Sequence, residues 1–469
     1  ELEFNTQLST SIVRTNCQQS FRCKVSTVVS ATSQGIKAPT WSVDELRATG
    51  PVVISFSGTD VDLAGTDLRL TVTNGGFSET TTSFAATVNQ WQVQTMESEL
   101  ITAQAQFELG DWSLSYGVYA LNKPVARGNF SLINNELKAS VEGSLNTDLK
   151  VNSQISAKLI DSSGSATFSL PALTLNQGRT LSSYLLGVTP EIDIVAGGLS
   201  AAGSLDWRFD SNDSLWIFGP LRFDAVDVSG AYDDSYFLGL STTLTAEFAN
   251  PLGLRTTKVQ TARIGTAELG LAISDISWGY EFDSTDSTMA IYDLTGNLLG
   301  GNVTIPQAKF QNFSSDTQLT VVISDLDLAQ ITALAEYPEL QVQGFVSGYL
   351  PVILSNGEIT MQEGLVSALN QGGSIRYNPL NPSTNTSIKL VNDALSNYQF
   401  KSLDSELFYD ELGDLNMQVK LRGGNPDMAG GQQINLNLGI VNNVPKMLES
   451  LRASRSISDA LERTLQRRQ

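Results

Sequence analysis

Apolar and polar residues alternate with a period of two along much of the chain. The alternation is clearest at Leu68, Leu70 and Val72, at Leu205, Trp207 and Phe209, and at Leu415, Met417, Val419 and Leu421. Successive side chains of a strand point to opposite faces, so each segment predicts a strand with one apolar face. Turn signals such as Asn74-Gly75-Gly76 separate these segments, as is typical of hairpins. The pattern predicts a mainly β protein, a meander of many antiparallel strands.

The last predicted strand carries the cleanest alternation. Its apolar positions are Ile434, Leu436, Leu438 and Ile440, and its other face carries Asn435, Asn437 and Gly439. One face of this strand is therefore expected to avoid water and the other to contact it.

Helical spacing replaces the alternation in two regions. Within residues 324–338, Leu328, Ile331 and Leu334 share one face of an amphipathic helix that Pro338 ends. Residues 443–469 predict two more amphipathic helices, and weaker helical turns are expected at residues 181–186 and 393–397. The predicted organisation is a β-rich segment over residues 1–323, a helix over 324–338, a second β segment over 339–442 and a helical C-terminus over 443–469.

Composition excludes several classes of site. The chain of 469 residues has 29 Lys plus Arg against 49 Asp plus Glu, a net charge of −20 that repels the phosphates of nucleic acid. Histidine is absent, which rules out a Ser-His-Asp triad and removes the commonest metal ligand. Carboxylate pairs such as Asp210 with Asp213 fit ordinary turns and complete no known calcium loop. We expect no enzyme activity, no metal and no cofactor, and no nucleic acid as a partner.

The two cysteines, Cys17 and Cys23, are too few for a cysteine-rich zinc or iron–sulfur site. A turn at residues 18–20 would bring them within the roughly 7 Å between Cα atoms that a disulfide needs. A disulfide in an oxidising compartment and a pair of buried reduced thiols both fit the sequence.

No window contains the ~18 consecutive apolar residues of a membrane span, and the first residues do not form a signal peptide. The chain therefore reads as an internal fragment, and any membrane anchor is expected before residue 1. Residues 444–469 form the only basic region. A basic amphipathic helix can lie on an anionic membrane surface, but a solvated helix that caps the sheet fits equally well.

The apolar strand faces allow two interpretations. A second sheet could cover them, as in a β-sandwich. If they stay open, they form a groove for apolar ligands, because sheltering a ~16-carbon acyl chain from water is worth on the order of 12 kcal/mol at ~0.8 kcal/mol per methylene. A chain that arrives from a bilayer leaves an equally apolar environment, so such a groove would conduct lipid and not trap it.

An ordered set of C-terminal motifs carries a family resemblance. The motifs are SDLDLAQI (324–331), QGFVSGYLPV (343–352), GGSIRYNP (372–379), LDSELFYDELG (403–413), LRGGNP (421–426), QINLNLGI (433–440) and NVPKMLESLR (443–452). Together they resemble the C-terminal region of the YdbH family, AsmA-like periplasmic bridge proteins of Gram-negative bacteria. The resemblance implies an elongated, twisted sheet curled into a hydrophobic groove, an N-terminal inner-membrane anchor, and phospholipid transport through the periplasm toward the outer membrane.

The resemblance also implies functional residues. The alternating apolar residues named above, from Leu68 to Leu421, and Ile434, Leu436 and Leu438 become candidates for the groove lining. Residues 434–440 become the candidate edge on which a small outer-membrane lipoprotein of the YnbE type docks by strand addition. The competing interpretations are a secreted or periplasmic structural or adhesive β-protein without lipid transfer, and a β-helical polysaccharide enzyme, both of which would bury the alternating residues fully.

Overall fold

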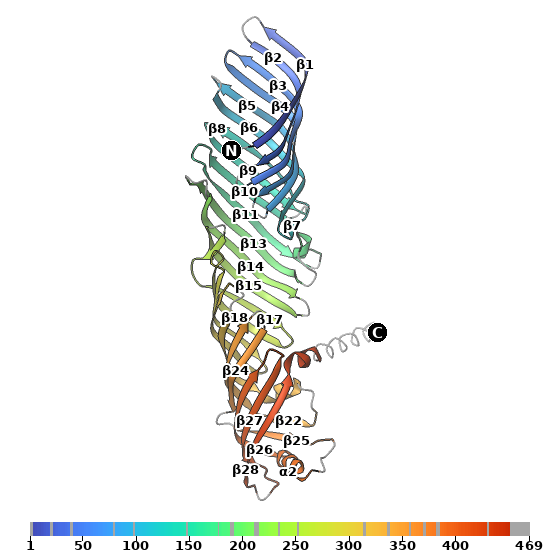
Figure 1. Cartoon of the computed structure of the whole chain (residues 1–469), viewed down its shortest axis with the longest axis vertical. Helices are drawn as coiled ribbons and strands as arrows, with labels where there is room; N and C mark the ends of the chain where they lie inside the picture. Colours follow the sequence, from blue (N-terminus) through green and yellow to red (C-terminus); the bar gives the residue numbers. More distant parts are fainter. Residues whose placement is uncertain are drawn as a thin grey trace, which may run out of the picture. The chain divides into compact units, whose positions relative to one another are not determined.

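The computed structural model describes residues 3–450, except for residues 19–21, 38–40, 78–79, 97–98, 147–148, 177, 188–191, 211–214, 233–234, 251–252, 313–315, 335–337, 356–357, 369–371, 381–384 and 429–430. The chain divides into two compact units. The first comprises Glu1–Asp233 and Thr243–Arg255, and the second comprises Asp234–Thr242 and Thr256–Gln469. Strands dominate both units (Figure 1).

The first unit is built from long strands joined mostly by hairpins. They are β1 (Glu3–Gln18), β2 (Arg22–Lys37), β3 (Trp41–Ser57), β4 (Asp60–Phe77), β5 (Thr80–Met96), β6 (Glu99–Tyr116), β7 (Tyr119–Leu121), β8 (Val125–Ile133), β9 (Glu136–Leu145), β10 (Leu149–Lys158), β11 (Ser163–Leu175), β12 (Leu185–Leu186), β13 (Ile192–Phe209) and β14 (Leu215–Tyr232). β1 to β6 each pair with the next strand in sequence, and β6, β8, β9, β10, β11, β13 and β14 continue the series. All of these pairings are antiparallel, as the alternation predicts. The turn predicted at residues 74–76 is wrong: these residues lie inside β4, where left-handed Asn74 (φ 50°) and a register shift between Val72 and Gly75 mark a bulge.

The second unit combines shorter strands with two α-helices. Its elements are β17 (Gln260–Glu268), β18 (Ala272–Asp283), β19 (Thr288–Leu298), β20 (Gly301–Gln311), β21 (Thr317–Asp327), α1 (Leu328–Leu334), β22 (Leu340–Gln343), β23 (Phe345–Ser355), β24 (Glu358–Ala368), β25 (Gly373–Tyr377), α2 (Thr386–Leu395), β26 (Tyr398–Tyr409), β27 (Asp414–Gly424) and β28 (Gln433–Asn443). Residues of β15 (Ser235–Ala249) and β16 (Gly253–Thr256) belong to both units. The mainly β, antiparallel fold class with a few short helices is confirmed.

The helices differ from the predictions in their bounds. α1 begins only at Leu328, because β21 continues through Asp327 and a left-handed residue at Asp325 (φ 53°) shifts the register of β21. The Asp327 carboxylate accepts a hydrogen bond of 2.8 Å from the Ala329 amide and so marks the start of the helix. The turn predicted at residues 393–397 is instead the end of α2, a ten-residue helix that sequence inspection missed. The turn predicted at residues 181–186 contains a 3-10 helix, η1 (Leu181–Ser183).

The predicted C-terminal helix is present over residues 444–450, and residues 451–469 lie outside the described residues. Leu448 of this helix packs against Gly270, in the turn between β17 and β18: a Cβ on Gly270 would lie 3.2 Å from Leu448 Cδ2. Among the described residues, no helix is both long and apolar enough to cross a membrane.

The N-terminal hairpin holds the cysteines. The register of β1 and β2 sets the backbone of Cys17 opposite Cys23. Cys23 is disulfide-bonded, and none of the described residues is a free cysteine.

Candidate functional site

Side chains of the first unit form apolar rows that cross consecutive strands on one face of the sheet, called here the apolar face of the first unit. One row consists of Gly65, Trp91, Ala105, Phe130, Ala139, Ile155, Ala166 and Leu205. A second consists of Val93, Ala103, Leu132, Leu137, Ala157, Gly164, Trp207 and Ile217. A third consists of Leu68, Val88, Phe107, Gly128, Val141, Ser153, Phe168, Gly203 and Leu221. No member of these rows carries a charge.

Bulky and small residues tend to alternate along each row, and several aromatic rings lie directly over glycines of the neighbouring strand. A Cβ on Gly128 would lie 3.0 Å from Phe107 Cζ, and a Cβ on Gly203 would lie 2.7 Å from Phe168 Cζ. Cross-strand contact of this kind covers backbone that glycine leaves bare. The rows therefore present a continuous apolar wall in which each ring fills the space next to a small residue.

Most of this wall is neither fully buried nor fully exposed. β10 shows the pattern clearly, because Val151, Ile155 and Ala157 are half-buried while Gln154 and Lys158 between and after them are exposed. The only buried cluster that the described residues form in this unit comprises Leu149, Leu175 and Tyr184, so it covers the face only locally. A β-sandwich core would bury the whole face, and the described part of the first unit contains no second sheet over it.

The local cover comes from the segment between β11 and β13. Asp193 of β13 accepts hydrogen bonds from the Ser182 amide (3.1 Å) and the Ser182 hydroxyl (2.8 Å) of η1. Burial raises the pKa of Asp193, but hydrogen bonds from Ser182, Thr180 and the Ile194 amide outweigh it and leave the pKa below its usual value. Asn122 donates a 2.8 Å hydrogen bond to the Ser183 carbonyl and ties the segment to the residues after β7.

The opposite face of the first unit carries mainly polar side chains, several of which are hydrogen-bonded across strands. Gln154 donates to Ser140 (2.8 Å), and Arg127 forms an ion pair with Glu142 (2.9 Å). The hydrogen bond and charge of Arg127 hold the pKa of Glu142 below its usual value. The two faces thus differ sharply in chemistry.

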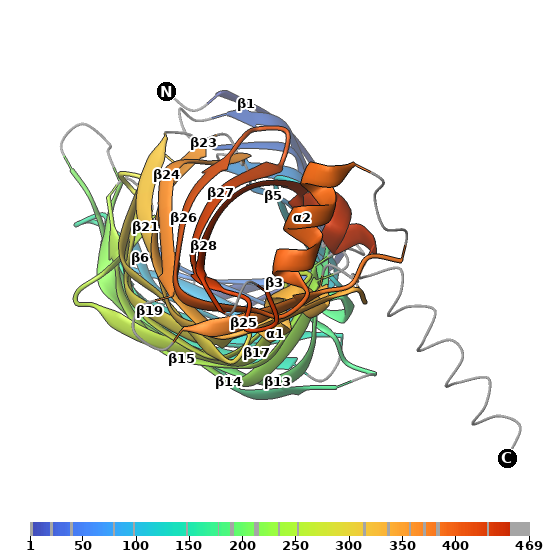
Figure 2. The ribbon, with the colours of Figure 1, turned by 90° about the horizontal axis from the view of Figure 1, so that it is seen from below.

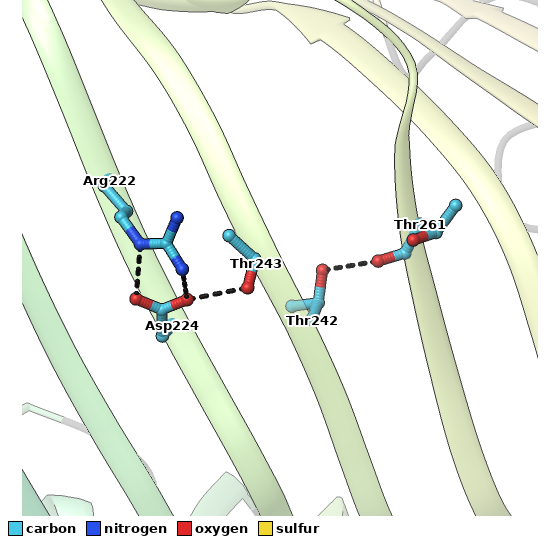
Figure 3. Close-up of polar contacts among 5 residues, drawn as sticks. All are labelled: Arg222, Asp224, Thr242, Thr243 and Thr261. Carbon is cyan, nitrogen blue, oxygen red and sulfur yellow. Dashed lines mark hydrogen bonds and ion pairs between the residues drawn. The ribbon is translucent and has the colours of Figure 1, made fainter.

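Side-chain hydrogen bonds also join β14 to β15. Asp224 accepts two hydrogen bonds from the Arg222 guanidinium (2.8 and 2.7 Å) and one of 2.6 Å from Thr243 (Figure 3). Within the second unit, the Thr242 hydroxyl donates to the Thr261 carbonyl at 2.9 Å (Figure 3).

The second unit carries apolar rows on the inner side of its curl. One row consists of Leu436, Leu421, Leu403 and Ala368. The next consists of Leu438, Val419, Ser405, Val366, Gly348, Ile323 and Val303. The candidate lining residues Val419, Leu421, Leu436 and Leu438 are therefore cross-strand neighbours. Figure 2 shows β26, β27 and β28 curving around one side, with α2 across from them.

A group of elements, called here the end cap, covers part of these rows. It comprises α1, β22, β25 and α2, and it contributes Val342, Ile375 and Leu395 to a buried cluster with Leu403 and Leu421. The apolar face of the second unit is thus closed locally at the end cap.

One amide holds α2 in place. Asn425 is fully buried, and its side-chain NH2 group donates to the carbonyls of Asp393 (2.9 Å) and Ala394 (3.2 Å) and to the Ser396 hydroxyl (3.3 Å). Its side-chain oxygen accepts from the Asp427 amide (2.8 Å). These bonds satisfy carbonyls that the helix end leaves without an intrahelical partner.

The other candidate residues occupy less sheltered positions. Leu68, Leu70 and Val72 are half-buried, with Leu70 between Ala48 and Ala86, whereas Phe209 is 43% exposed at the end of β13. Leu415 and Met417 are half-buried near the start of β27.

The candidate docking strand, β28, pairs with β27, and no other described strand has a pairing register with it. Along β28, Ile434, Leu436 and Leu438 are half-buried and Asn435, Asn437 and Gly439 are exposed, but Ile440 is also exposed. The apolar side of β28 is therefore partly covered at Ile434, Leu436 and Leu438 but exposed at Ile440, before the strand ends.

Sequence inspection missed the residues that fill the middle of the rows, such as Trp91, Phe107, Phe130 and Ile155. The signal was available, because residues 149–158 alternate as regularly as the segments that were selected. Ser405 also went unnoticed: its buried hydroxyl has no hydrogen-bond partner and lies within an apolar row.

Nothing in the described part of the chain assembles a metal site from His, Cys, Asp and Glu side chains. What the arrangement offers chemically is an uncharged apolar surface on one face and polar, cross-linked surface on the other. Such a surface can bind hydrocarbon.

The family comparison agrees with this chemistry. A family model described as YdbH-like, intermembrane phospholipid transport protein YdbH, matches residues 14–466. No curated protein matches the chain in sequence. Because the match covers nearly the whole chain, the resemblance seen in the C-terminal motifs extends through the N-terminal strands, and the chain belongs to the YdbH-like family of intermembrane phospholipid transport proteins.

Proposed function

We propose that the apolar rows of both units hold the acyl chains of phospholipids while the lipids move between two membranes. The observation that carries the proposal is the run of uncharged, half-buried rows across consecutive strands of the first unit. A half-buried apolar wall is costly in water and gains free energy when hydrocarbon covers it. Movement along the wall needs no catalytic group, since a lipid slides from one set of apolar contacts to the next.

The proposal places the protein in the periplasm, tethered to the inner membrane by a segment before the residues of this chain, and without enzymatic activity. The function of the family supports it. An oxidising compartment also suits a disulfide between Cys17 and Cys23, whose backbones lie opposite each other.

We further propose that residues 434–440 of β28 receive a strand from a small outer-membrane lipoprotein of the YnbE type. The supporting observation is the outer edge of β28, whose backbone groups have no strand partner among the described residues. Addition of the lipoprotein should slow amide hydrogen exchange in residues 434–440. Unchanged exchange in a mixture that still forms the complex would contradict this docking edge.

Photo-crosslinking tests the lipid path. A benzophenone side chain placed at Leu205 or Leu436 should capture phospholipid, because both positions lie in apolar rows. The same probe at Ser204 or Asn437, each adjacent in sequence to one of these positions, points to the polar face and should capture none. Equal capture of phospholipid from both faces would refute the proposal. So would a protein in which neither face captures phospholipid and native mass spectrometry finds no bound lipid.

A further inference from the structure

The helix at residues 444–450 contacts two turns of the second unit that are distant in sequence. Pro445 meets the turn between β26 and β27, where a Cβ on Gly413 would lie 2.6 Å from Pro445 Cγ. Leu448 meets the turn between β17 and β18, where a Cβ on Gly270 would lie 3.2 Å from Leu448 Cδ2. The two contacting residues are separated by less than one helical turn, about 4.5 Å of rise. The helix therefore holds the two turns close together.

The same turns are far apart along the sheet. Nine successive antiparallel pairings lead from β17 to β28. At about 4.8 Å per strand, a flat sheet would separate these two strands by roughly 43 Å. One short helix can join them because the sheet of the second unit curls back on itself. The helix thus closes this curl, and residues 444–450 are called here the clasp.

Hydrogen bonds fix the start of the clasp to the last hairpin. The Val444 amide donates to the Gly413 carbonyl at 2.9 Å. The side-chain NH2 group of Asn443 donates to the Asp414 carboxylate at 2.7 Å. The side-chain oxygen of Asn443 accepts from the Lys446 amide at 3.1 Å, as an N-cap residue does. These directional bonds set the angle at which the clasp leaves β28.

The clasp lies next to the apolar side of β28. Asn442 follows Ile440 at the two-residue spacing of that side, since the register of β28 against β27 is continuous. The side-chain NH2 group of Asn442 contacts Met447 Sδ at 3.4 Å. Met447 and Leu448 are half-buried, whereas Glu449 is exposed. The half-buried side of the clasp is therefore adjacent to Ile440, where the apolar side of β28 is uncovered.

The contact at the far end of the clasp is apolar. Gly270 is buried and adopts a left-handed conformation (φ 97°), so the turn offers Leu448 a surface without a side chain. An apolar contact of a half-buried leucine has no fixed direction, unlike the hydrogen bonds at the start of the clasp. The far end can therefore separate from the turn while residues 443–444 stay attached to the last hairpin.

We infer that the clasp is a side gate of the second unit. In the closed state it joins the two ends of the curl, and in the open state it lets phospholipid enter or leave the apolar rows beside Ile440. The inference rests on the proposed function, because it names where lipid exchanges with the rows. An opening at the side allows acyl chains to leave while the charged headgroup stays in water, which avoids the cost of burying that charge.

A reversible crosslink tests the gate. A Cβ on Gly270 would lie 3.5 Å from Leu448 Cβ, and disulfides join Cβ atoms about 3.5–4.5 Å apart. Oxidation of G270C/L448C should therefore lock the clasp. Transfer of fluorescent phospholipid between vesicles by the whole chain should become at least about tenfold slower and recover on reduction, because a locked gate limits the rate. The single variant L448C and the wild type, treated in the same way, should show no redox response.

A second pair of variants opens the gate without a crosslink. L448S removes the apolar contact at Gly270 and should release bound phospholipid about fivefold faster, as expected for the loss of a half-buried leucine contact. E449S changes the exposed neighbouring residue and should release lipid at the wild-type rate. Amide hydrogen exchange in residues 444–450 should be faster in L448S than in E449S.

Equal transfer by oxidised and reduced G270C/L448C, with the new disulfide verified by peptide mapping, would overturn the inference, and so would equal release from L448S and E449S. A redox response of the same size in the wild type would assign the effect to the native disulfide and would overturn it as well. Native mass spectrometry separates these results from failure of the proposed function. Lipid bound to a wild type whose variants show no change refutes the gate alone, whereas a wild type that neither binds nor transfers lipid refutes both.

Discussion

A single carboxylate on the apolar face of the first unit should stop lipid movement, and Ile155 is the best place to introduce it. Ile155 lies on β10 between two alanines, Ala139 on β9 and Ala166 on β11. Neither neighbour offers a hydrogen bond or a positive charge. In I155D, the new carboxylate would therefore stand alone on the wall, in water when the face is empty and under hydrocarbon when a lipid passes.

The size of the effect follows from these surroundings. Loss of a half-buried isoleucine side chain costs about 1–1.5 kcal/mol of stability. An acyl chain that passes must strip water from the carboxylate, and an unpaired charge in an apolar environment costs several kcal/mol. At about 1.4 kcal/mol per tenfold in rate, a barrier increase of about 3–4 kcal/mol slows transfer by about two to three orders of magnitude. I155N, which is polar but uncharged, should cause a clearly smaller slowing.

Transfer of fluorescent phospholipid between donor and acceptor vesicles measures the rate, with thermal unfolding as the test of fold. The matched control is Q154D, one residue away on the polar face, where Gln154 donates to Ser140 at 2.8 Å. Q154D loses that exposed hydrogen bond and should transfer lipid at the wild-type rate. If folded I155D transfers as fast as Q154D, acyl chains do not travel along this face.

Three further changes test the packing described above. G128A should destabilise the first unit by about 1–3 kcal/mol, because its Cβ would lie 2.2 Å from the Ser140 carbonyl oxygen. The control G143A, whose Cβ meets nothing closer than 3.8 Å, should change the unfolding free energy by less than about 0.5 kcal/mol. Similar losses of stability in the two variants would refute the close-approach argument. N425A should lower the free energy of unfolding by about 2–4 kcal/mol and speed amide hydrogen exchange in α2, since four hydrogen bonds disappear. Unchanged exchange in α2 would contradict the anchoring role of Asn425. The pKa of Asp193 is lowered, so the stabilising contribution of its carboxylate is complete at neutral pH and is lost as pH falls below the ordinary value of 3.8. Pepsin should therefore cut residues 176–187 increasingly as acidity rises, and D193N should abolish that pH dependence. An acid response that persists in D193N would be evidence against the η1 contact.

The strands could be predicted from the sequence, because period-two alternation is a local property. Leu205 and Trp207 share a face for that reason, and so do Leu436 and Leu438. Which residues meet across strands could not be predicted, since bulges change the register. In β4, Asp67 adopts a left-handed conformation (φ 56°) and lets Gly65 and Leu68 join rows on the same face, although three positions separate them.

The degree to which each apolar residue is buried could not be predicted from the sequence either. Alternation alone is the same for a sandwich core and an open face, so the half-buried state of Ile155 depends on what the rest of the chain leaves uncovered. The end cap shows the opposite case. Tyr398 and Leu421 are fully buried because β22, β25 and α2, short elements with weak sequence signals, fold over them.

The pairing of nearly every strand of the first unit with its immediate neighbours in sequence also bears on how the unit forms and changes length. Each added hairpin finds its partner nearby, so loop-closure entropy is small and formation can proceed strand by strand as the chain emerges. The same arrangement lets evolution insert or delete a hairpin without disturbing distant contacts. Because each strand occupies about 4.8 Å across a sheet, one hairpin more or less changes the reach of the apolar wall by about 10 Å, which gives selection a simple way to match such a protein to the width of its compartment.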